Sequence, residues 1–204
     1  MAVSVFPLGP IQTNSYVINN GSAAVAVDVG GDPAPIARYL KDNHFSLKAI
    51  CITHMHFDHL YGVAALAKDT GASVYTPEKD APLLGTEMSQ GGLWNLPLVP
   101  SFESLPIHAS ENAVFGGMTC RVMHVPGHTP GSLAYYFPQE NCVFTGDTLF
   151  EAAVGRTDFP FGNHKQLVAA IRSELLTLPK NTIVYPGHGP STTISRELRD
   201  NPYL

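Results

Sequence analysis

The sequence has little charge and few cysteines. Only 14% of its 204 residues are charged, the formal net charge is −5, and no basic run stands out. This balance argues against a nucleic-acid partner. The cysteines, Cys51, Cys120 and Cys142, show no CxxC spacing, and two of them lie within apolar runs. We therefore expect buried, reduced thiols in a cytoplasmic protein.

The sequence also lacks a long apolar segment. No window approaches the roughly 20 apolar residues that span a membrane, so we expect no membrane partner. Residues 1–7 have neither a basic stretch nor a long apolar core, and we expect no signal peptide. Hydrophobic residues still make up 44% of the chain, which is enough for a buried core. At this length we expect one domain over residues 1–204.

Apolar runs separated by Gly, Pro and Asn predict alternating strands and helices. The expected strands cover residues 3–8, 15–18, 23–29, 48–52, 73–76, 118–125, 132–137, 142–145 and 182–185. The expected helices begin at Asp32-Pro33, cover 63–68, run from a capping box at Asn163 through Leu176, and cover 194–199. Strands followed by strand–helix units occur twice, which predicts an α/β fold. An αββα sandwich fits this pattern, with two mixed sheets packed face to face and helices outside.

Residues 85–112 interrupt the pattern with repeated Gly and Pro. We expect a long connection here, and such loops often border functional sites. Its single tryptophan, Trp94, could line a pocket or fill the side of the core. The sequence assigns this connection no definite role.

Potential metal ligands are concentrated in the run THMHFDH, residues 53–59. Two histidines at i and i+2 on an extended backbone point to the same side. Asp58 and His59 follow where the chain can turn into a helix and point at a second position nearby. Imidazole suits Zn, Fe, Cu and Ni, and a carboxylate adds a charged ligand that can bridge two ions.

Three further candidate ligands each follow a glycine at a predicted strand end. They are His128, Asp147 and His188. Glycine permits a sharp turn and a close approach of the main chain, and loops at neighbouring strand ends can converge on one edge. Each residue alone would be weak evidence, but with the first motif the set offers five imidazoles and two carboxylates, enough for two divalent ions. We expect surface or hydrogen-bonded roles for the other histidines, His44, His108, His124 and His164.

Over nearly the whole chain these motifs resemble the metallo-β-lactamase superfamily. The resemblance implies an αββα fold and two divalent ions, foremost zinc, with iron or manganese as alternatives. The ligand sets that it implies are His54, His56 and His128 for one ion, Asp58, His59 and His188 for the other, and Asp147 as a bridge. It also implies that Asp28, at the end of its strand, and Thr53 support the ligands.

Four segments resemble the short, single-domain glyoxalase II-like hydrolases more specifically. They are PGHTPGS (126–132), TGDTLF (145–150), GRTDFP (155–160) and PGHGPST (186–192). The resemblance implies hydrolysis of a small-molecule thioester of the S-lactoylglutathione type, as in hydroxyacylglutathione hydrolases. Longer glyoxalase II enzymes carry a C-terminal helical domain that binds glutathione, whereas this sequence ends about a dozen residues after its last motif. The thiol carrier therefore stays open.

The predicted site favours a thioester over a lactam. Metal binding lowers the pKa of water toward about 7, so hydroxide is available at neutral pH. A thiol, with a pKa near 8.5, leaves as thiolate without a strong acid, whereas an amine needs a proton that the motifs do not supply. Asp58 is the candidate proton acceptor for the activated water. Arg156 and Asp158 are candidate substrate-binding residues, although they could equally form an internal ion pair that fixes their loop.

Other activities stay open alongside hydrolysis. Mono-iron persulfide dioxygenases resemble residues 155–159, and their iron ligands match His56 or its neighbour His54, His128 and Asp147. A β-lactamase is disfavoured because look-alike enzymes often have cysteine at position 147 or lack the bridging carboxylate, and a nuclease because the charge is wrong. A non-catalytic metal-binding protein is disfavoured because unpaired buried carboxylates and imidazoles are costly. The oligomeric state is not predicted.

Overall fold

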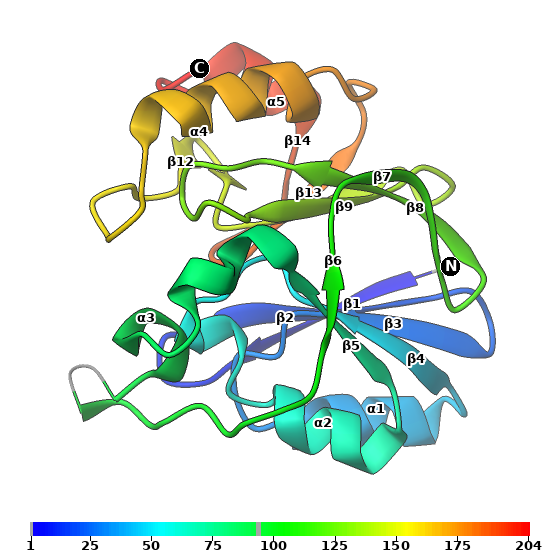
Figure 1. The fold of residues 1–204 in the computed structure, drawn as a ribbon. Coiled ribbons are helices and arrows are strands. Elements are labelled where there is room, and N and C mark those ends of the chain that lie inside the picture. The colour runs from blue at the N-terminus through cyan, green and yellow to red at the C-terminus, as the bar shows by residue number, and fades with distance from the viewer. Residues whose placement is uncertain (1, 93–94) are drawn as a thin grey trace.

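The computed structural model describes residues 2–92 and 95–204, and its centre consists of two six-stranded sheets packed face to face (Figure 1). The first sheet has the order β1 (Ala2–Leu8), β2 (Thr13–Asn19), β3 (Ala23–Val27), β4 (Ser46–Cys51), β5 (Ser73–Pro77), β6 (Leu105–Ile107). The second has the order β14 (Thr192–Thr193), β13 (Ile183–Pro186), β10 (Cys142–Gly146), β9 (Leu133–Phe137), β8 (Met118–His124), β7 (Ser110–Phe115). A small hairpin joins β11 (Leu149–Phe150) to β12 (Ala153–Val154).

Both sheets are mixed, as the sequence predicts. Strands β3 to β6 pair in parallel, whereas β1, β2 and β3 form antiparallel pairs. In the second sheet β10 and β13 are parallel and the other pairs are antiparallel. Each predicted strand lies within about two residues of an observed one.

Helices cover the outer face of each sheet (Figure 1). The first sheet carries α1 (Ala34–Asp42) and α2 (Val63–Thr70), and the second carries α4 (His164–Ala170), its extension η4 (Ile171–Leu175) and α5 (Ile194–Asp200). Shorter helices are η1 (Phe57–His59), η2 (Glu78–Leu83) and α3 (Glu87–Gln90). The layers are therefore helix, sheet, sheet, helix, and the predicted αββα sandwich is confirmed. In the described part of the chain, no helix combines the length and the apolar character needed to cross a membrane.

Alternation along the strands divides the core into layers. Tyr16 and Ile18 face the second sheet, whereas Val17 between them packs among the residues of α1 and α2. Successive side chains of a strand point to opposite faces, so a strand covered on both faces is apolar throughout. The predicted burial of the cysteines is confirmed, because all of them are free and buried in the layer between the sheets.

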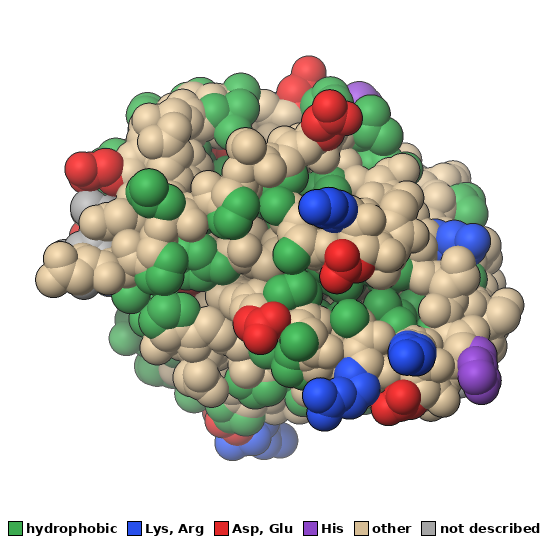
Figure 2. All heavy atoms as spheres, turned by 90° about the horizontal axis from the view of Figure 1, so that it is seen from below, with side chains coloured by type: hydrophobic (Ala, Val, Ile, Leu, Met, Phe, Trp, Pro, Cys, Tyr) green, Lys and Arg blue, Asp and Glu red, His purple; other side chains and the backbone are tan. Residues whose placement is uncertain are grey.

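The face formed by α1 and α2 is seen from below in Figure 2. Its Lys and Arg side chains are interspersed with Asp and Glu and with apolar groups, and they form no single basic patch there. This distribution agrees with the low charge of the sequence.

Two predicted helix boundaries differ from the structure in detail. Helix α1 begins at Ala34 with Pro33 at the N-cap position, and Asp32 accepts the Ala34 N–H through Oδ1 at 3.0 Å instead of capping the helix itself. Asn163 does cap α4, because its Oδ1 accepts the Gln166 N–H at 3.0 Å. The helix then ends in a π-helical turn, which a side-chain pattern does not reveal.

The segment 85–112 is a long connection, as the sequence predicts, but it also contains short regular elements that the sequence does not predict. It contains α3, strand β6 and the start of β7. Strand β6 lies at the edge of the first sheet and pairs only with β5, and an edge strand tolerates a proline such as Pro106. Trp94 lies outside the described residues, so both of its predicted roles stay predictions.

Gly127 links the second sheet to α4. Its φ is +136°, its carbonyl accepts the Asn163 N–H at 2.7 Å, and an added Cβ would lie 2.3 Å from the Leu167 backbone nitrogen. Any side chain here would therefore strain the backbone and push α4 away from the loop that carries His128.

We predict that Gly127→Ala lowers the free energy of unfolding by about 3 kcal/mol or more, because strain and a backbone clash add together. Gly71→Ala is the matched control, because Gly71 also has a positive φ, +70°, but open space around its Cβ position; it should cost about 1 kcal/mol. Urea unfolding of both variants measures the difference. Equal losses would show that the contact with Leu167 is unimportant.

Candidate metal centre

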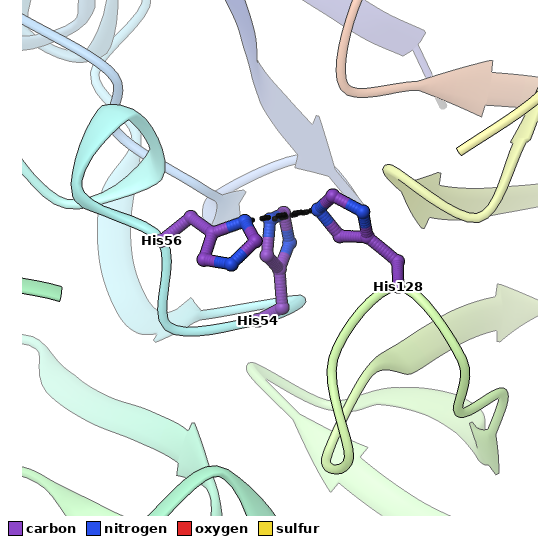
Figure 3. A group of neighbouring side chains, drawn as sticks. All are labelled: His54, His56 and His128. Atoms are coloured by element: carbon purple, nitrogen blue, oxygen red, sulfur yellow. Dashed lines mark hydrogen bonds between the residues drawn. The ribbon is translucent and has the colours of Figure 1, made fainter. Parts of the chain in front are cut away.

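All seven predicted ligands converge where the sheets meet. The residues come from the loops after β4, β8, β10 and β13. The Nε2 atom of His128 lies 3.2 Å from His54 Nε2 and 2.9 Å from His56 Nδ1 (Figure 3). Beside this first group, Asp58 Oδ2 lies 3.2 Å from His188 Nε2 and 3.4 Å from His59 Nε2. The structure thus brings together both ligand sets that the resemblance implies, and a third set, His54, His59 and Asp147, links them.

Asp147 lies between the two groups. Its Oδ1 is 3.4 Å from His59 Nε2, and its Oδ2 is 3.7 Å from His128 Nε2 and 3.6 Å from His188 Nε2. One carboxylate therefore lies near nitrogens of both groups, and the bridging role that the resemblance implies for Asp147 stays a prediction. Gly187 makes room for it, because an added Cβ would lie 2.2 Å from Asp147 Oδ1.

The spacing and the unmet polar atoms fit divalent cations. Nitrogens bound tetrahedrally at about 2.0–2.1 Å to one ion stand roughly 3.3 Å apart, close to the spacing in the first group. His59 Nε2 and Asp147 Oδ1 are buried and have no hydrogen-bond partner within residues 2–92 and 95–204. Such atoms are costly unless something satisfies them, and a cation between them would do so. The seven residues therefore include groups of side chains that could hold metal ions.

Local backbone geometry aims the ligands of the THMHFDH run. His54 and His56 point into the site (Figure 3), whereas Met55 between them is buried in the core layer between the first sheet and the helices α1 and α2. The chain then turns into η1, which carries Asp58 and His59. The predicted change from extended to helical backbone is confirmed, and it separates the two ligand groups.

Asp28 forms hydrogen bonds with His59 and with Thr53, the neighbour of His54. It is buried, with φ +55°, a conformation that aspartate adopts more readily than most residues. Its Oδ1 accepts the Thr53 N–H at 2.8 Å, and its Oδ2 accepts the Thr53 hydroxyl and His59 Nδ1–H, both at 2.7 Å. The bond to Nδ1 leaves His59 Nε2 free to bind a cation.

Several supporting contacts carry no clear signal in the sequence. The Thr13 hydroxyl donates to Asp58 Oδ2 at 2.9 Å, and the Arg156 carbonyl accepts His128 Nδ1–H at 2.7 Å. Asn14 donates to the carbonyls of Pro186 and Gly189 on either side of His188. The polar run 13–15 at the start of β2 is almost fully buried. Three adjacent polar residues at the start of a strand are the one sequence feature that indicates these supporting contacts.

The pKa values of the histidines are shifted in opposite directions in the two groups. Burial lowers the pKa of His54 well below its usual range and that of His56 to about 3. Burial would also lower the pKa of His59, but Asp58, Asp28 and Asp147 outweigh it and raise that pKa well above its usual value. The pKa of His188 is raised too, because the bond to Asp58 outweighs burial.

The two ligand carboxylates show the reverse balance. Burial would raise the pKa values of Asp58 and Asp147, but the charge of His59 outweighs it, and both pKa values are lowered. Both carboxylates are therefore ionised at neutral pH, and each offers an anionic ligand.

A cavity of about 380 Å³ opens onto the ligands. Its apolar walls come from Ile11, Phe57, Met88, Phe150, Val154 and Phe159, and its floor from His56, Asp58, His128, Asp147 and His188. Met88 belongs to α3, so the segment 85–112 does border the site. A small molecule in this cavity would contact the metal ligands directly.

Arg156 lines this cavity but already has a partner. Its Nε and an Nη atom donate to the two Asp158 oxygens, both at 2.7 Å, and its guanidinium lies 3.8 Å from the centre of the Phe159 ring. The internal ion pair foreseen as the alternative is therefore present. Asp158 is exposed and is absent from the cavity lining. A substrate role for either residue stays a prediction.

The other histidines lie apart from the site. His44, His108 and His164 are exposed, and the half-buried His124 forms a 2.9 Å hydrogen bond with the Pro130 carbonyl. These positions agree with the expected surface or hydrogen-bonded roles.

Comparison with protein families supports the site. The family described as the metallo-beta-lactamase superfamily matches residues 8–188. A probable metallo-hydrolase, YqgX of Bacillus subtilis, is 33% identical over 97% of this chain and 95% of its own. The hydroxyacylglutathione hydrolase GloC of Haemophilus influenzae is 32% identical over 100% of this chain and 98% of its own.

Solved structures share the fold over almost the whole chain. The B3 metallo-beta-lactamase BLEG-1 gives a TM-score of 0.93 at 38% identity, covering 100% of this chain and 99% of its own. TTHA1623, described in a di-iron-bound form, gives 0.87 at 37% identity, covering 98% and 100%. ETHE1 from Myxococcus xanthus gives 0.75 at 28% identity, covering 99% and 84%.

We predict that acidification weakens metal binding by the second group first. A protonated ring cannot bind a cation, so affinity at His59 and His188 falls as pH drops through their raised pKa values. His54 and His56 keep their lone pairs to far lower pH, because their pKa values are lowered.

Two variants, each lacking one group, separate the effects. His188→Ala leaves the first group intact, and His56→Ala leaves the second. Zinc affinity measured between about pH 7 and pH 5 should fall by a larger factor in His56→Ala than in His188→Ala. If zinc affinity fell equally with pH in both variants, or more steeply in His188→Ala, the opposite pKa shifts of the two groups would be contradicted.

Proposed function

The chain belongs to the metallo-β-lactamase superfamily, and we propose that it hydrolyses a small-molecule thioester with two divalent ions. The observation that carries this proposal is the pair of complete ligand groups, with Asp147 within reach of both, at the floor of one cavity. The likeness to GloC, named as a hydroxyacylglutathione hydrolase, supports a thioester of that type.

The donor set supports zinc first. His54, His56 and His128 would hold one ion, and Asp58, His59 and His188 the other, with Asp147 shared between them. Imidazole and carboxylate donors also suit iron and manganese, and the di-iron form of TTHA1623 supports iron as an alternative. When bound, the two ions supply a hydroxide at neutral pH and polarise the substrate carbonyl.

Asp58 is the proposed proton acceptor for the attacking water. The Thr13 hydroxyl and His188 contact its Oδ2 at 2.9 and 3.2 Å, which fixes the orientation of the carboxylate. Its lowered pKa makes it a weak base, so its first task is to hold the cation and its second is to receive a proton.

The cavity offers little help to a basic leaving group. The carboxylic acids that line it, Asp58 and Asp147, have lowered pKa values, and Arg156 is paired with Asp158. His188 also lines it and has a raised pKa, but as a ligand its ring would hold a cation instead of a proton. None of these groups is a good proton donor at neutral pH. A thiolate leaves without a proton, whereas an amine does not. This supports a thioester over the β-lactam suggested by the likeness to BLEG-1.

The chemistry of the thiol carrier is less defined. Arg156 is the only Lys or Arg among the described residues that line the cavity, and Asp158 already neutralises it. Apolar walls and the size of the cavity support a small molecule as the substrate, rather than a nucleic acid. The three free, buried thiols support a reducing compartment, and we place the protein in the cytoplasm.

A second candidate is oxygen-dependent oxidation of a persulfide at one iron. The likeness to ETHE1 supports it, and so does the approach of His128 Nε2 to Asp147 Oδ2, at 3.7 Å, beside His54 and His56. The second ligand group argues against it, because Asp58, His59 and His188 would have no purpose in a mono-iron enzyme.

We predict that the protein loaded with zinc hydrolyses S-lactoylglutathione or a simpler acyl thioester, with no oxygen uptake. Chelation should abolish the activity and metal should restore it. His188→Ala should lower kcat/KM by about 100-fold or more, whereas His164→Ala, at an exposed position on α4, should leave it unchanged.

Parallel assays with glutathione persulfide and a β-lactam, on zinc-loaded and iron-loaded protein, separate the candidates. Oxygen uptake with the persulfide by protein that holds one iron would favour the dioxygenase. Turnover of the β-lactam without any thioester hydrolysis would also contradict the proposal.

A further inference from the structure

Asp80 is a buried carboxylate outside the set of seven ligands. It lies in η2, after β5, and is completely buried. Its Oδ1 accepts the Gly131 N–H at 2.6 Å, and its Oδ2 accepts the Met55 N–H and the Thr129 hydroxyl, both at 3.0 Å. All three donors are neutral, so none of them supplies the opposite charge that usually accompanies a buried carboxylate.

The three donors lie on the two loops that carry the first ligand group. Met55 stands between His54 and His56 on the loop after β4, in the first sheet. Thr129 and Gly131 follow His128 on the loop after β8, in the second sheet. One side chain therefore bonds to both of the loops that must meet to form this group.

We propose that Asp80 is a positioning residue that holds the loop of His54 and His56 against the loop of His128, so that their nitrogens meet at one cation. This rests on the proposed metal centre. Hydrogen bonds to a charged acceptor are short and strong, and supporting contacts of this kind tune metal affinity. Asp80 thus positions the loops of the first group through hydrogen bonds, just as the hydrogen bond to Asp28 positions His59 in the second group.

The packing around Asp80 requires a close approach by the second loop. An added Cβ on Gly131 would lie 2.4 Å from the Asp80 backbone nitrogen and 2.7 Å from its Oδ1. The Thr129 hydroxyl is also 2.7 Å from the Ser132 hydroxyl, which fixes its direction. Glycine at 131 and a hydroxyl at 129 are therefore part of the same arrangement.

The contacts of Asp80 predict an effect on one group only. It bonds to none of the ligands Asp58, His59 and His188, nor to their neighbours Phe57 and Gly189, in the described part of the chain. A variant that merely destabilised the fold would weaken both groups. A loss confined to the first group distinguishes positioning from general stability.

The test compares Asp80→Asn with Glu197→Gln. Glu197 is also buried and also accepts hydrogen bonds from three neutral donors, on Thr192, Ala152 and Asn201. It lies in α5, away from the two loops. Each substitution is placed in His188→Ala, which retains the first group, and in His56→Ala, which retains the second. Metal-free proteins are titrated with Co²⁺ by visible absorption against a competing chelator, and their urea unfolding is measured alongside.

We expect Asp80→Asn to weaken Co²⁺ binding by the first group about 10- to 100-fold and by the second less than about 3-fold. Glu197→Gln should change the Co²⁺ affinity of neither group by more than about 3-fold, even if it lowers the free energy of unfolding as much as Asp80→Asn does. If Asp80→Asn does not fold, Thr129→Val removes one of the three bonds at similar size and should weaken the first group alone, by a smaller factor.

Equal losses in both groups, or the same loss in Glu197→Gln, would overturn the inference. So would unchanged Co²⁺ affinity in Asp80→Asn or, where that variant is not folded, in Thr129→Val. Failure of the parent variants to bind any Co²⁺ would instead refute the proposed metal centre itself, and the inference with it.

Discussion

Imidazole and carboxylate groups are crowded together where two sheets meet, and most of them are buried. Asp58 Oδ2 and Asp147 Oδ1 each lie 3.4 Å from His59 Nε2, and His128 Nε2 lies 2.9 Å from His56 Nδ1. Such a group is costly without a cation, because His59 Nε2 and Asp147 Oδ1 have no hydrogen-bond partner among the described residues. The fold is therefore best understood as the frame that holds these side chains at metal-binding distances.

Neither sheet could form the centre alone. The first sheet supplies the run from His54 to His59, and the second supplies His128, Asp147 and His188. Two buried carboxylates, Asp28 and Asp80, fix the parts in place, one within the first sheet and one across both. The apolar layer between the sheets holds the sheets together, and it therefore also keeps the ligand groups close to each other.

The convergence of the seven side chains could be predicted from sequence because each lies in a segment that follows a strand, and strand ends on neighbouring strands meet in space. Asp80, Thr13 and the Arg156 carbonyl could not be predicted, because their partners lie far away in the chain. Strand β6 was missed for a similar reason: it exists through pairing with β5, and its own residues include a proline. For Arg156, two outcomes were foreseen and the structure contains the ion pair with Asp158.

A crystal structure of the zinc-loaded protein, with anomalous data collected on both sides of the zinc absorption edge, tests the central claim most directly. Two anomalous peaks should lie roughly 3.5–4 Å apart. One should lie about 2.0–2.2 Å from nitrogens of His54, His56 and His128. The other should lie at the same range from Asp58, His59 and His188, with Asp147 between them. No peak at these residues, or side chains turned away from one another, would contradict the account.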